Sequence, residues 1–518
     1  MAKTSGTVAV KNAELAAAAR PQPHSHTGMA AARFAHWARS PPHAFSPGLR
    51  PHHRAHWSDG CTIPDVTLNR SLVLDGPGSE PVARLVRRLE RGAPVQLAVL
   101  GASVTSGHGI AESPVSNYTW PAQLERAMRY VWSNPLVRVH NAAMPSTTAA
   151  FAAMCIDTLV PMRVDLILIE YSFTTFHAEQ LQSLIEEARA RSTAVIVVEY
   201  ANLAAGRDGL RIPWNTCKMW KLKPEKTDTL GRNCTPRVVL PHPPYDDLES
   251  VRVRHGEMLA ASGLPVVSIQ PFAPMLRDFG FGGATDLRRF LAGDGIHLSS
   301  MGHWLYVRAI MHALWTTPRR STATEHRRRS GRSAGSQATA RSTCAFRSNL
   351  EALVRPAAAQ PTADAAAWRY VVERRDKPGL VSREAGGVVE LGVPYAGEAA
   401  AVHLIYLKSY EHMGQARFEC RGGCSCRAAT IDAHNERRVS LETPAAPIEV
   451  AFAPGTAECR LRGVTLQSTR SGEHKFKLTA LVVTPLAFKV KSGIVDVASF
   501  VDWSTKEVYA HAASLHGT

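Results

Sequence analysis

The stretch Val95-Gln96-Leu97-Ala98-Val99-Leu100-Gly101-Ala102-Ser103-Val104-Thr105-Ser106-Gly107 decides how this chain is expected to fold. Its first part is mostly apolar and predicts a strand buried on both faces, which is typical of a parallel sheet. A serine follows this strand at once, between glycines at 101 and 107. Reactive side chains gather at the carboxyl ends of parallel strands, so Ser103 is a candidate nucleophile.

A second short segment, Asp294-Gly295-Ile296-His297, carries the residue types that such a serine needs. A serine hydroxyl is a poor nucleophile until a base takes its proton, and a carboxylate holds that base in the right tautomer. His297 is therefore a candidate general base and Asp294 its orienting group. The alternative is structural, since an Asp-x-x-His turn is often a helix N-cap, here before the helix expected over Met301–Trp315.

Strand-like and helix-like segments alternate between about residues 80 and 316. Such alternation predicts a parallel sheet with helices on both faces, a three-layer α/β/α domain. The helices are expected over Trp120–Trp132, Ala178–Arg191 and Met301–Trp315, each with an apolar stripe on one face. The strands are expected over Val95–Gly101, Leu136–His140, Asp165–Tyr171, Ala194–Tyr200 and Pro265–Ile269.

After Trp368 the pattern changes to alternating segments separated by Gly and Pro, which predicts a C-terminal antiparallel β-sandwich. The segments are Gly387–Val393, Ala401–Tyr406, Ile448–Phe452 and Lys475–Val483. No internal repeat, P-loop or dinucleotide fingerprint is present. The predicted division of the chain is a disordered or targeting N-terminus (1–60), an α/β/α domain (61–316), a basic disordered linker (317–365), the β-sandwich (366–486) and a C-terminal tail (487–518).

The net charge of +16 is unevenly distributed. Residues 319–347 hold eight arginines against Glu325 alone, and residues 1–60 hold seven basic residues against two acidic ones, so these two segments carry 12 of the 16 charges. The basic residues of 319–347 stand in a Ser/Thr/Ala-rich stretch without the interleaved aromatic residues of a single-strand binding surface. We therefore expect no nucleic-acid partner. No apolar run is long enough for a membrane span.

Nine cysteines favour disulfides in an oxidising compartment. Cys420, Cys424, Cys426 and Cys459 lie close in the sequence, at a spacing that fits a zinc site poorly. Cys217 and Cys234 are a further candidate pair. Glycosylation sequons at Asn69, Asn117 and Asn233 point weakly the same way. A secreted or cell-wall location is favoured, and an organellar one stays open, since residues 1–60 are rich in Ala and Arg and lack a signal-peptide core.

Over about residues 95–316 these motifs resemble the SGNH (GDSL-like) hydrolase superfamily. Gly101-Ala102-Ser103 is similar to its first sequence block, which supplies the nucleophile and one oxyanion donor. Asn141-Ala142-Ala143-Met144-Pro145-Ser146 is similar to the second, with Ser146 where the family usually has glycine; a backbone N–H from serine serves equally if the local φ and ψ tolerate a Cβ. Asp294–His297 is similar to the fourth.

The third block departs from the family pattern. Thr174, after the strand that ends near Tyr171, stands where the family's oxyanion-hole asparagine belongs. Losing one oxyanion donor costs about 10²–10³ in rate. The oxyanion hole that the resemblance implies is therefore Ser103, Ser146 and Thr174, the last with a shorter side chain than an amide.

The resemblance implies a serine esterase that removes acyl groups from carbohydrate or small esters through an acyl-serine intermediate, without metal or organic cofactor. An acyltransferase acting on a sugar hydroxyl is not distinguished by sequence. The alternative is a weak or inactive SGNH-fold protein that binds cell-wall glycan. The C-terminal segment resembles the β-rich module of algal and plant-like SGNH proteins, with Tyr406 and Tyr410 as candidate exposed aromatic platforms. A purely structural sandwich is the alternative for that module.

Overall fold

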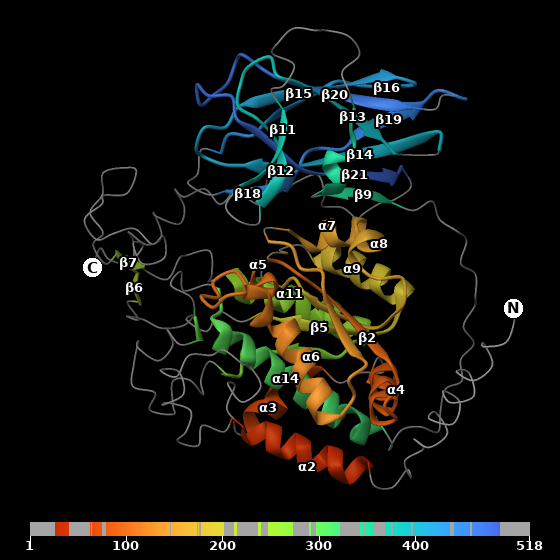
Figure 1. The fold of residues 1–518 in the computed structure, drawn as a ribbon, viewed down its shortest axis with the longest axis vertical. Helices are drawn as coiled ribbons and strands as arrows, with labels where there is room; N and C mark the ends of the chain where they lie inside the picture. The colour runs from red at the N-terminus through yellow and green to blue at the C-terminus, as the bar shows by residue number, and fades with distance from the viewer. Residues whose placement is uncertain are drawn as a thin grey trace, which may run out of the picture.

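The protein is described from a computed structural model, which defines the conformation of just over three fifths of the sequence in two packed domains (Figure 1). The described residues are 26–40, 63, 65–74, 79–145, 147–172, 175, 178–200, 212–214, 237–239, 247–272, 290–291, 297–321, 342–346, 348–355, 368–373, 377–394, 397–435, 440–455 and 458–486. The expected tail, 487–518, lies outside this set.

A six-stranded sheet forms the centre of the first domain, in the order β1-β8-β5-β4-β2-β3. All neighbouring pairs are parallel except β1 with β8. The predicted parallel α/β/α domain is thereby confirmed, with every expected strand within two residues of its observed bounds. The strands are β1 (Leu72–Leu74), β2 (Val95–Gly101), β3 (Val137–Asn141), β4 (Val164–Glu170), β5 (Ser192–Glu199) and β8 (Val266–Ser268).

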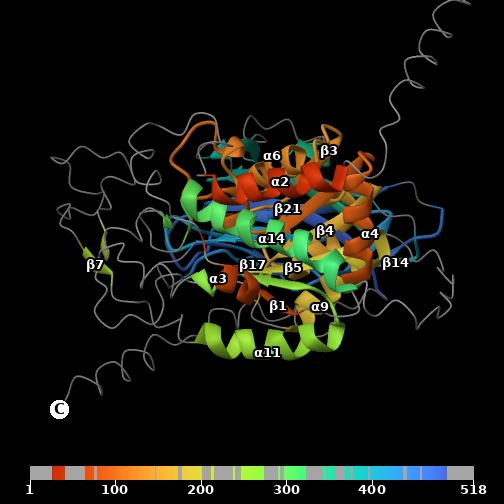
Figure 2. The same ribbon diagram turned by 90° about the horizontal axis from the view of Figure 1, so that it is seen from below.

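Helices cover both faces of this sheet because its strands are apolar on both sides. In β2, Leu97 and Val99 point into one core and Ala98 and Leu100 into the other. The first core packs against α4 (Ser79–Glu90), α6 (Trp120–Val131) and α14 (Ser300–Ser321). The second packs against α7 (Ala149–Met154), α8 (Ile156–Leu159), α9 (Ala178–Arg191) and α11 (Asp247–Ser262). Figure 2 shows α11 on the side of the sheet opposite α6 and α2.

The prediction of disorder over residues 1–60 is wrong for residues 26–40, which contain helix α2 (His26–Arg39). The indole of Trp37 is only 1% exposed and packs against Trp304 of α14. The guanidinium of Arg308 lies over the ring of Trp37 and donates to the carbonyl oxygens of Trp37 and Ser40, at the end of α2. A cation at a helix C-terminus satisfies carbonyls that have no partner within the helix. These contacts order a segment whose composition alone predicts no secondary structure.

The second domain is a β-sandwich of two antiparallel sheets, as predicted. One sheet runs β10-β13-β20-β15-β17 and the other β11-β12-β21-β14-β19-β16, with β18 and β9 paired to β14 and β21. The strands are β9 (Thr343–Phe346), β10 (Val354–Arg355), β11 (Arg369–Glu373), β12 (Lys377–Ser382), β13 (Val388–Val393), β14 (Ala399–Lys408), β15 (Gln415–Gly422), β16 (Cys424–Cys426), β17 (Ala429–Asp432), β18 (Leu441–Pro444), β19 (Ile448–Phe452), β20 (Cys459–Thr465) and β21 (Phe476–Pro485).

The prediction of a disordered linker over residues 317–365 is wrong at both ends of that range. Helix α14 continues to Ser321, and β9, α15 (Ser348–Glu351) and β10 belong to the second domain. Strand β9 is ordered because it pairs with β21 and because Cys344 forms a disulfide with Cys155, between α7 and α8. Because the surrounding stretch is rich in arginine, the sequence pattern did not indicate this strand.

The two domains share one apolar core. Side chains of α7 and α9 pack in the same cluster as Cys344 of β9, Ile405 of β14 and Val482 of β21. The β-sandwich thus lies on the α7–α9 helix layer, as Figure 1 shows. A shared core and a covalent bond make a fixed junction.

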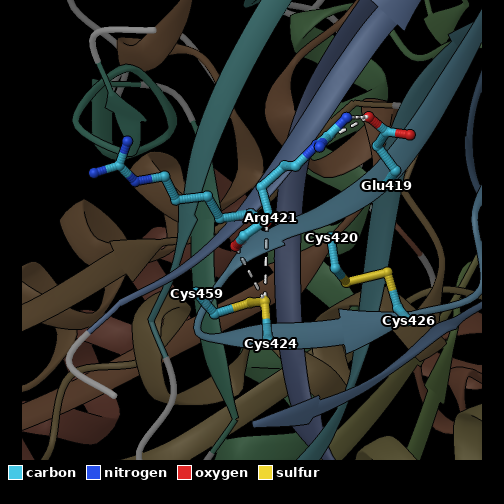
Figure 3. The surroundings of a disulfide bond; sticks show 7 residues. Glu419, Cys420, Arg421, Cys424, Cys426 and Cys459 are labelled. Carbon is cyan, nitrogen blue, oxygen red and sulfur yellow. Dashed lines mark hydrogen bonds and ion pairs between the residues drawn. A yellow bond between two sulfur atoms is a disulfide. The ribbon is translucent and has the colours of Figure 1, made fainter. Parts of the chain in front are cut away.

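Disulfides join the cysteine cluster of the second domain, as the sequence predicted. Cys420 pairs with Cys426 and Cys424 with Cys459, so the two bridges lie side by side where β15, β16 and β20 meet (Figure 3). The suggested pair Cys217 and Cys234 lies outside the described residues. Further short elements are α3 (Asp65–Ser71), the 3₁₀ helix η3 (Val115–Asn117), β6 (Ile212–Trp214) and β7 (Arg237–Val239). Among the described helices, none has the length and apolar character to span a bilayer.

Candidate active site

Ser103 begins α5 (Ser103–Ser106), the short helical turn that follows β2 at the carboxyl edge of the sheet. The turn needs glycine at both ends. A Cβ on Gly101 would lie 2.5 Å from the hydroxyl oxygen of Thr105, and Gly107 closes the turn with a φ of 90°, which disfavours any larger residue. The two glycines thus let the chain reverse tightly and present Ser103 at the end of the strand.

His297 lies just before α14, on the segment that the sequence singled out. Its neighbours anchor it: Leu298 forms a β-bridge with Leu291, and Ser299 donates its backbone N–H to the carbonyl oxygen of Phe290. A Cβ on Gly302 would collide with that same carbonyl oxygen, so only glycine allows α14 to approach so closely.

The fold brings these two residues together although 194 positions separate them. The Oγ of Ser103 lies 2.9 Å from Nε2 of His297, within hydrogen-bond distance. Both residues are partly exposed, so a substrate can reach them from solvent. The ring of His108 packs edge-on against the ring of His297, with centroids 4.5 Å apart. His108, which follows α5, therefore lines the same site.

The second sequence block, which begins at Asn141, runs beside the turn that carries Ser103. The N–H of Met144 donates to the carbonyl oxygen of Gly101, and the side chain of Asn141 donates to the carbonyl oxygen of Thr105. These bonds bring the Met144 end of that loop alongside Ser103. The candidate residues Ser146, Thr174 and Asp294 lie outside the described residues.

A buried polar chain lies directly behind the nucleophile turn. Nε1 of Trp120 donates to Oγ1 of Thr105 at 3.1 Å, and Oγ1 of Thr105 donates to Oε2 of Glu170 at 2.7 Å. Burial raises the pKa of Glu170 to about 8, and the bond from Thr105 opposes that rise only in part. Glu170 is therefore mostly protonated at neutral pH.

His303 lies behind the same site with no exposure to solvent. Its Nδ1 accepts the backbone N–H of Trp120 at 3.1 Å. Burial, with a smaller contribution from the nearby His297, lowers the pKa of His303 to about 3. His303 is thus a neutral residue that holds the start of α6 in place.

The sequence patterns assign no role in this site to Glu170, Thr105 or Trp120. One signal was available, because Gly101 and Glu170 end adjacent parallel strands and a hydroxyl stands four residues after that glycine.

In the second domain the expectation for Tyr406 is wrong: its ring is 7% exposed and stacks on Phe476. Alternation along β14 places it in the core rather than on the surface.

Solved structures share this fold, whereas the sequence matches no protein-family model and no curated protein. A two-domain esterase active on acetylated mannans is 16% identical, with a TM-score of 0.51 over 81% of this chain and 98% of that one. The same kind of enzyme co-crystallised with mannopentaose is 15% identical, with a TM-score of 0.51 over 82% and 99%. A Clostridium thermocellum family 3 carbohydrate esterase is 14% identical over 44% of this chain and 98% of its own, with a TM-score of 0.27.

Nearly the whole length of the two-domain esterase is aligned, so both domains and their connection are part of the shared fold. The architecture that the sequence predicted, an α/β/α domain followed by a β-rich domain, is therefore also the architecture of this esterase.

Proposed function

We propose that this protein is a serine esterase of the SGNH type that hydrolyses acyl esters through an acyl-serine intermediate. One observation carries the proposal: the 2.9 Å contact between Oγ of Ser103 and Nε2 of His297 at the carboxyl edge of a parallel sheet. A base within hydrogen-bond reach of a hydroxyl is the first requirement for activating it.

The proposed reaction follows from the atoms in contact. Oγ of Ser103 attacks the ester carbonyl while Nε2 of His297 takes its proton, which gives a tetrahedral intermediate. His297 then protonates the departing alcohol and the acyl group remains on Ser103. Water, deprotonated by His297, attacks the acyl-serine and releases the acid. Asp294 is proposed to orient His297 through its other ring nitrogen.

The oxyanion is proposed to bind to backbone N–H groups of Ser103 and Ser146, with Thr174 as a third donor. The bond from Met144 to Gly101 supports the part of Ser146, because it brings the loop just before that residue alongside Ser103. Fixed donors aimed at the developing charge supply much of the rate in acyl transfer.

The proposed substrates are esters in which an acyl group, acetyl first of all, is joined to a carbohydrate hydroxyl or to a small alcohol. The fold shared over both domains with an esterase active on acetylated mannans supports this class. The proposal requires no cofactor, since serine and histidine perform every proton transfer in it.

Hydrolysis of p-nitrophenyl acetate by wild type, Ser103→Ala and His297→Ala tests the proposal. We expect turnover by the wild type alone, and a fluorophosphonate probe should label Ser103, as peptide mapping by mass spectrometry would show. Turnover that persists in Ser103→Ala, or a label on another residue, would contradict the assignment. A wild type without turnover or labelling that still binds glycan would instead favour the non-catalytic alternative.

A further inference from the structure

The polar chain Trp120–Thr105–Glu170 is unusual because it is buried, continuous and centred on the turn that carries Ser103. All three residues are at most 1% exposed. A buried hydroxyl costs free energy unless its hydrogen bonds are made, so a threonine at this position needs both of its partners. Thr105 has them: it accepts from the Trp120 indole and donates to the Glu170 carboxyl.

The sheet register explains why Thr105 and Glu170 meet. Gly101, the last residue of β2, lies opposite Glu170, the last residue of β4. With no side chain on Gly101, the hydroxyl of Thr105 reaches across the end of β2; a Cβ there would also lie 3.0 Å from the carbonyl oxygen of Glu170. The space that Gly101 leaves is filled by the hydroxyl of Thr105.

Thr105 holds the turn through both its side chain and its backbone carbonyl. Its side chain is bonded to β4 through Glu170 and to α6 through Trp120, while its carbonyl oxygen accepts from the Asn141 amide at the end of β3 at 3.4 Å. Since α5 has only four residues, a shift of Thr105 would move Ser103, its first residue. Three separate elements therefore fix the turn through this one residue.

We propose that Glu170 and Thr105 are positioning residues for the reaction, which hold Ser103 at proton-transfer distance from His297. The inference rests on the proposed function, because it assigns Ser103 as the nucleophile. The hydrogen bonds of Thr105 run to Glu170, Trp120 and Asn141, so the two residues act on Ser103 through the backbone of α5. A displacement of about 1 Å at a reacting atom can cost about 10²-fold in rate.

The test is steady-state hydrolysis of p-nitrophenyl acetate by full-length Thr105→Val and Thr105→Ser. Valine matches the shape of threonine but offers no hydroxyl, so we expect kcat to fall roughly 10- to 100-fold with KM unchanged. Serine restores the hydroxyl, and kcat should recover most of that loss. A role in packing alone would give the opposite order, because serine lacks the methyl group.

A second pair of variants tests the carboxyl. Glu170→Gln keeps an acceptor for Thr105 and should keep most of the activity, whereas Glu170→Leu removes the acceptor and should lower kcat as Thr105→Val does. Thr479→Val is the matched control. It removes a buried threonine hydroxyl that donates to the carbonyl oxygen of Ile405 in the β-sandwich, and it should leave kcat unchanged.

The outcomes separate this inference from the proposed function. Folded Thr105→Val with wild-type kcat, beside an inactive Ser103→Ala, would overturn the positioning role and leave the esterase assignment intact. A wild type that neither turns over the ester nor reacts with fluorophosphonate would overturn both. If Glu170→Leu does not fold, as thermal melting would show, the threonine series alone decides, since a wild-type rate in Thr105→Val still refutes the proposal.

Discussion

Glu170 of the α/β domain and Lys477 of the β-sandwich are both buried, but their surroundings act on their charges in opposite ways. In the α/β domain, the buried carboxyl of Glu170 accepts a hydrogen bond from the Thr105 hydroxyl, and burial leaves it mostly uncharged at neutral pH. In the β-sandwich, the side chain of Lys477 is only 2% exposed, but its ammonium lies 3.1 Å from the carboxylate of Glu373, which also binds Lys475 and Arg383. Burial lowers the pKa of Lys477, and the contact with Glu373 opposes that shift.

This difference distinguishes the surroundings of Ser103, where the reaction is proposed to occur, from the β-sandwich. Partial burial alone would raise the pKa of Glu373, but hydrogen bonds from Lys475 and Lys477 outweigh it and hold the pKa below its usual value. The sandwich thus neutralises its charges with one another and is further tied by disulfides. Beside Ser103, the α/β domain instead joins uncharged polar groups in a hydrogen-bonded chain, Trp120 to Thr105 to Glu170. Substitutions in the two regions should therefore affect different properties.

The largest expected effect is on the rate. Ser103→Ala should lower kcat/KM for p-nitrophenyl acetate by at least about 10⁴-fold, because the covalent route is lost. The free energy of unfolding should change by less than about 0.5 kcal/mol, since the side chain is small and partly exposed. A large loss of stability, measured by urea titration, would break the proposed separation of roles.

The disulfide between the domains should have the largest effect on stability. Cys155 and Cys344 close a loop of 189 residues, and in the chain-entropy model their joint replacement by alanine costs about 5 kcal/mol. The matched control is the pair Cys420 and Cys426, only 6 residues apart, whose replacement should cost about 2 kcal/mol. Denaturant titration measures both, and equal losses would contradict the loop-length explanation.

The charge cluster of the sandwich gives a smaller, asymmetric effect. Glu373→Gln leaves Lys477 buried without its carboxylate and should cost about 2–3 kcal/mol, reduced from the value for fully buried pairs because the Glu373 side chain is 22% exposed. Lys477→Met leaves Glu373 with two other cations and should cost about 1 kcal/mol. Neither should change kcat, and an altered rate would connect the sandwich to the chemistry.

A last expected effect is a pH dependence of stability that arises in the α/β domain. The folded-state pKa of Glu170, about 8, lies above its ordinary value of 4.5, so folding is coupled to proton uptake between these values and stability falls as pH rises. Protonation of His303 in the unfolded state acts in the other direction only below about pH 6.5.

Between pH 6.5 and 9 we therefore expect the free energy of unfolding to fall by about 2 kcal/mol in the wild type. Glu170→Gln should remove this decrease, as denaturant titrations at the two pH values would show. An unchanged pH dependence in the variant would mean that Glu170 is charged at neutral pH.

Much of the fold was predictable because local patterns carried it. The apolar runs of β2 and β4 and the one-face stripes of α6 and α9 identify their elements without knowledge of partners. Errors occurred where order depends on distant contacts. Helix α2 needs the indole of Trp304 and the guanidinium of Arg308, and β9 needs β21 and Cys155. No local periodicity reports such contacts.

The sequence by itself determined which elements form and which residue types stand at their ends, because hydrophobic periodicity, glycines and short motifs act over a few residues. Ser103 after a strand and His297 before a helix belong to this part. Only the tertiary structure decided that the two atoms lie 2.9 Å apart, that Thr105 meets Glu170 and that Cys155 meets Cys344. Those contacts depend on strand register and on how layers pack, which are properties of the whole chain.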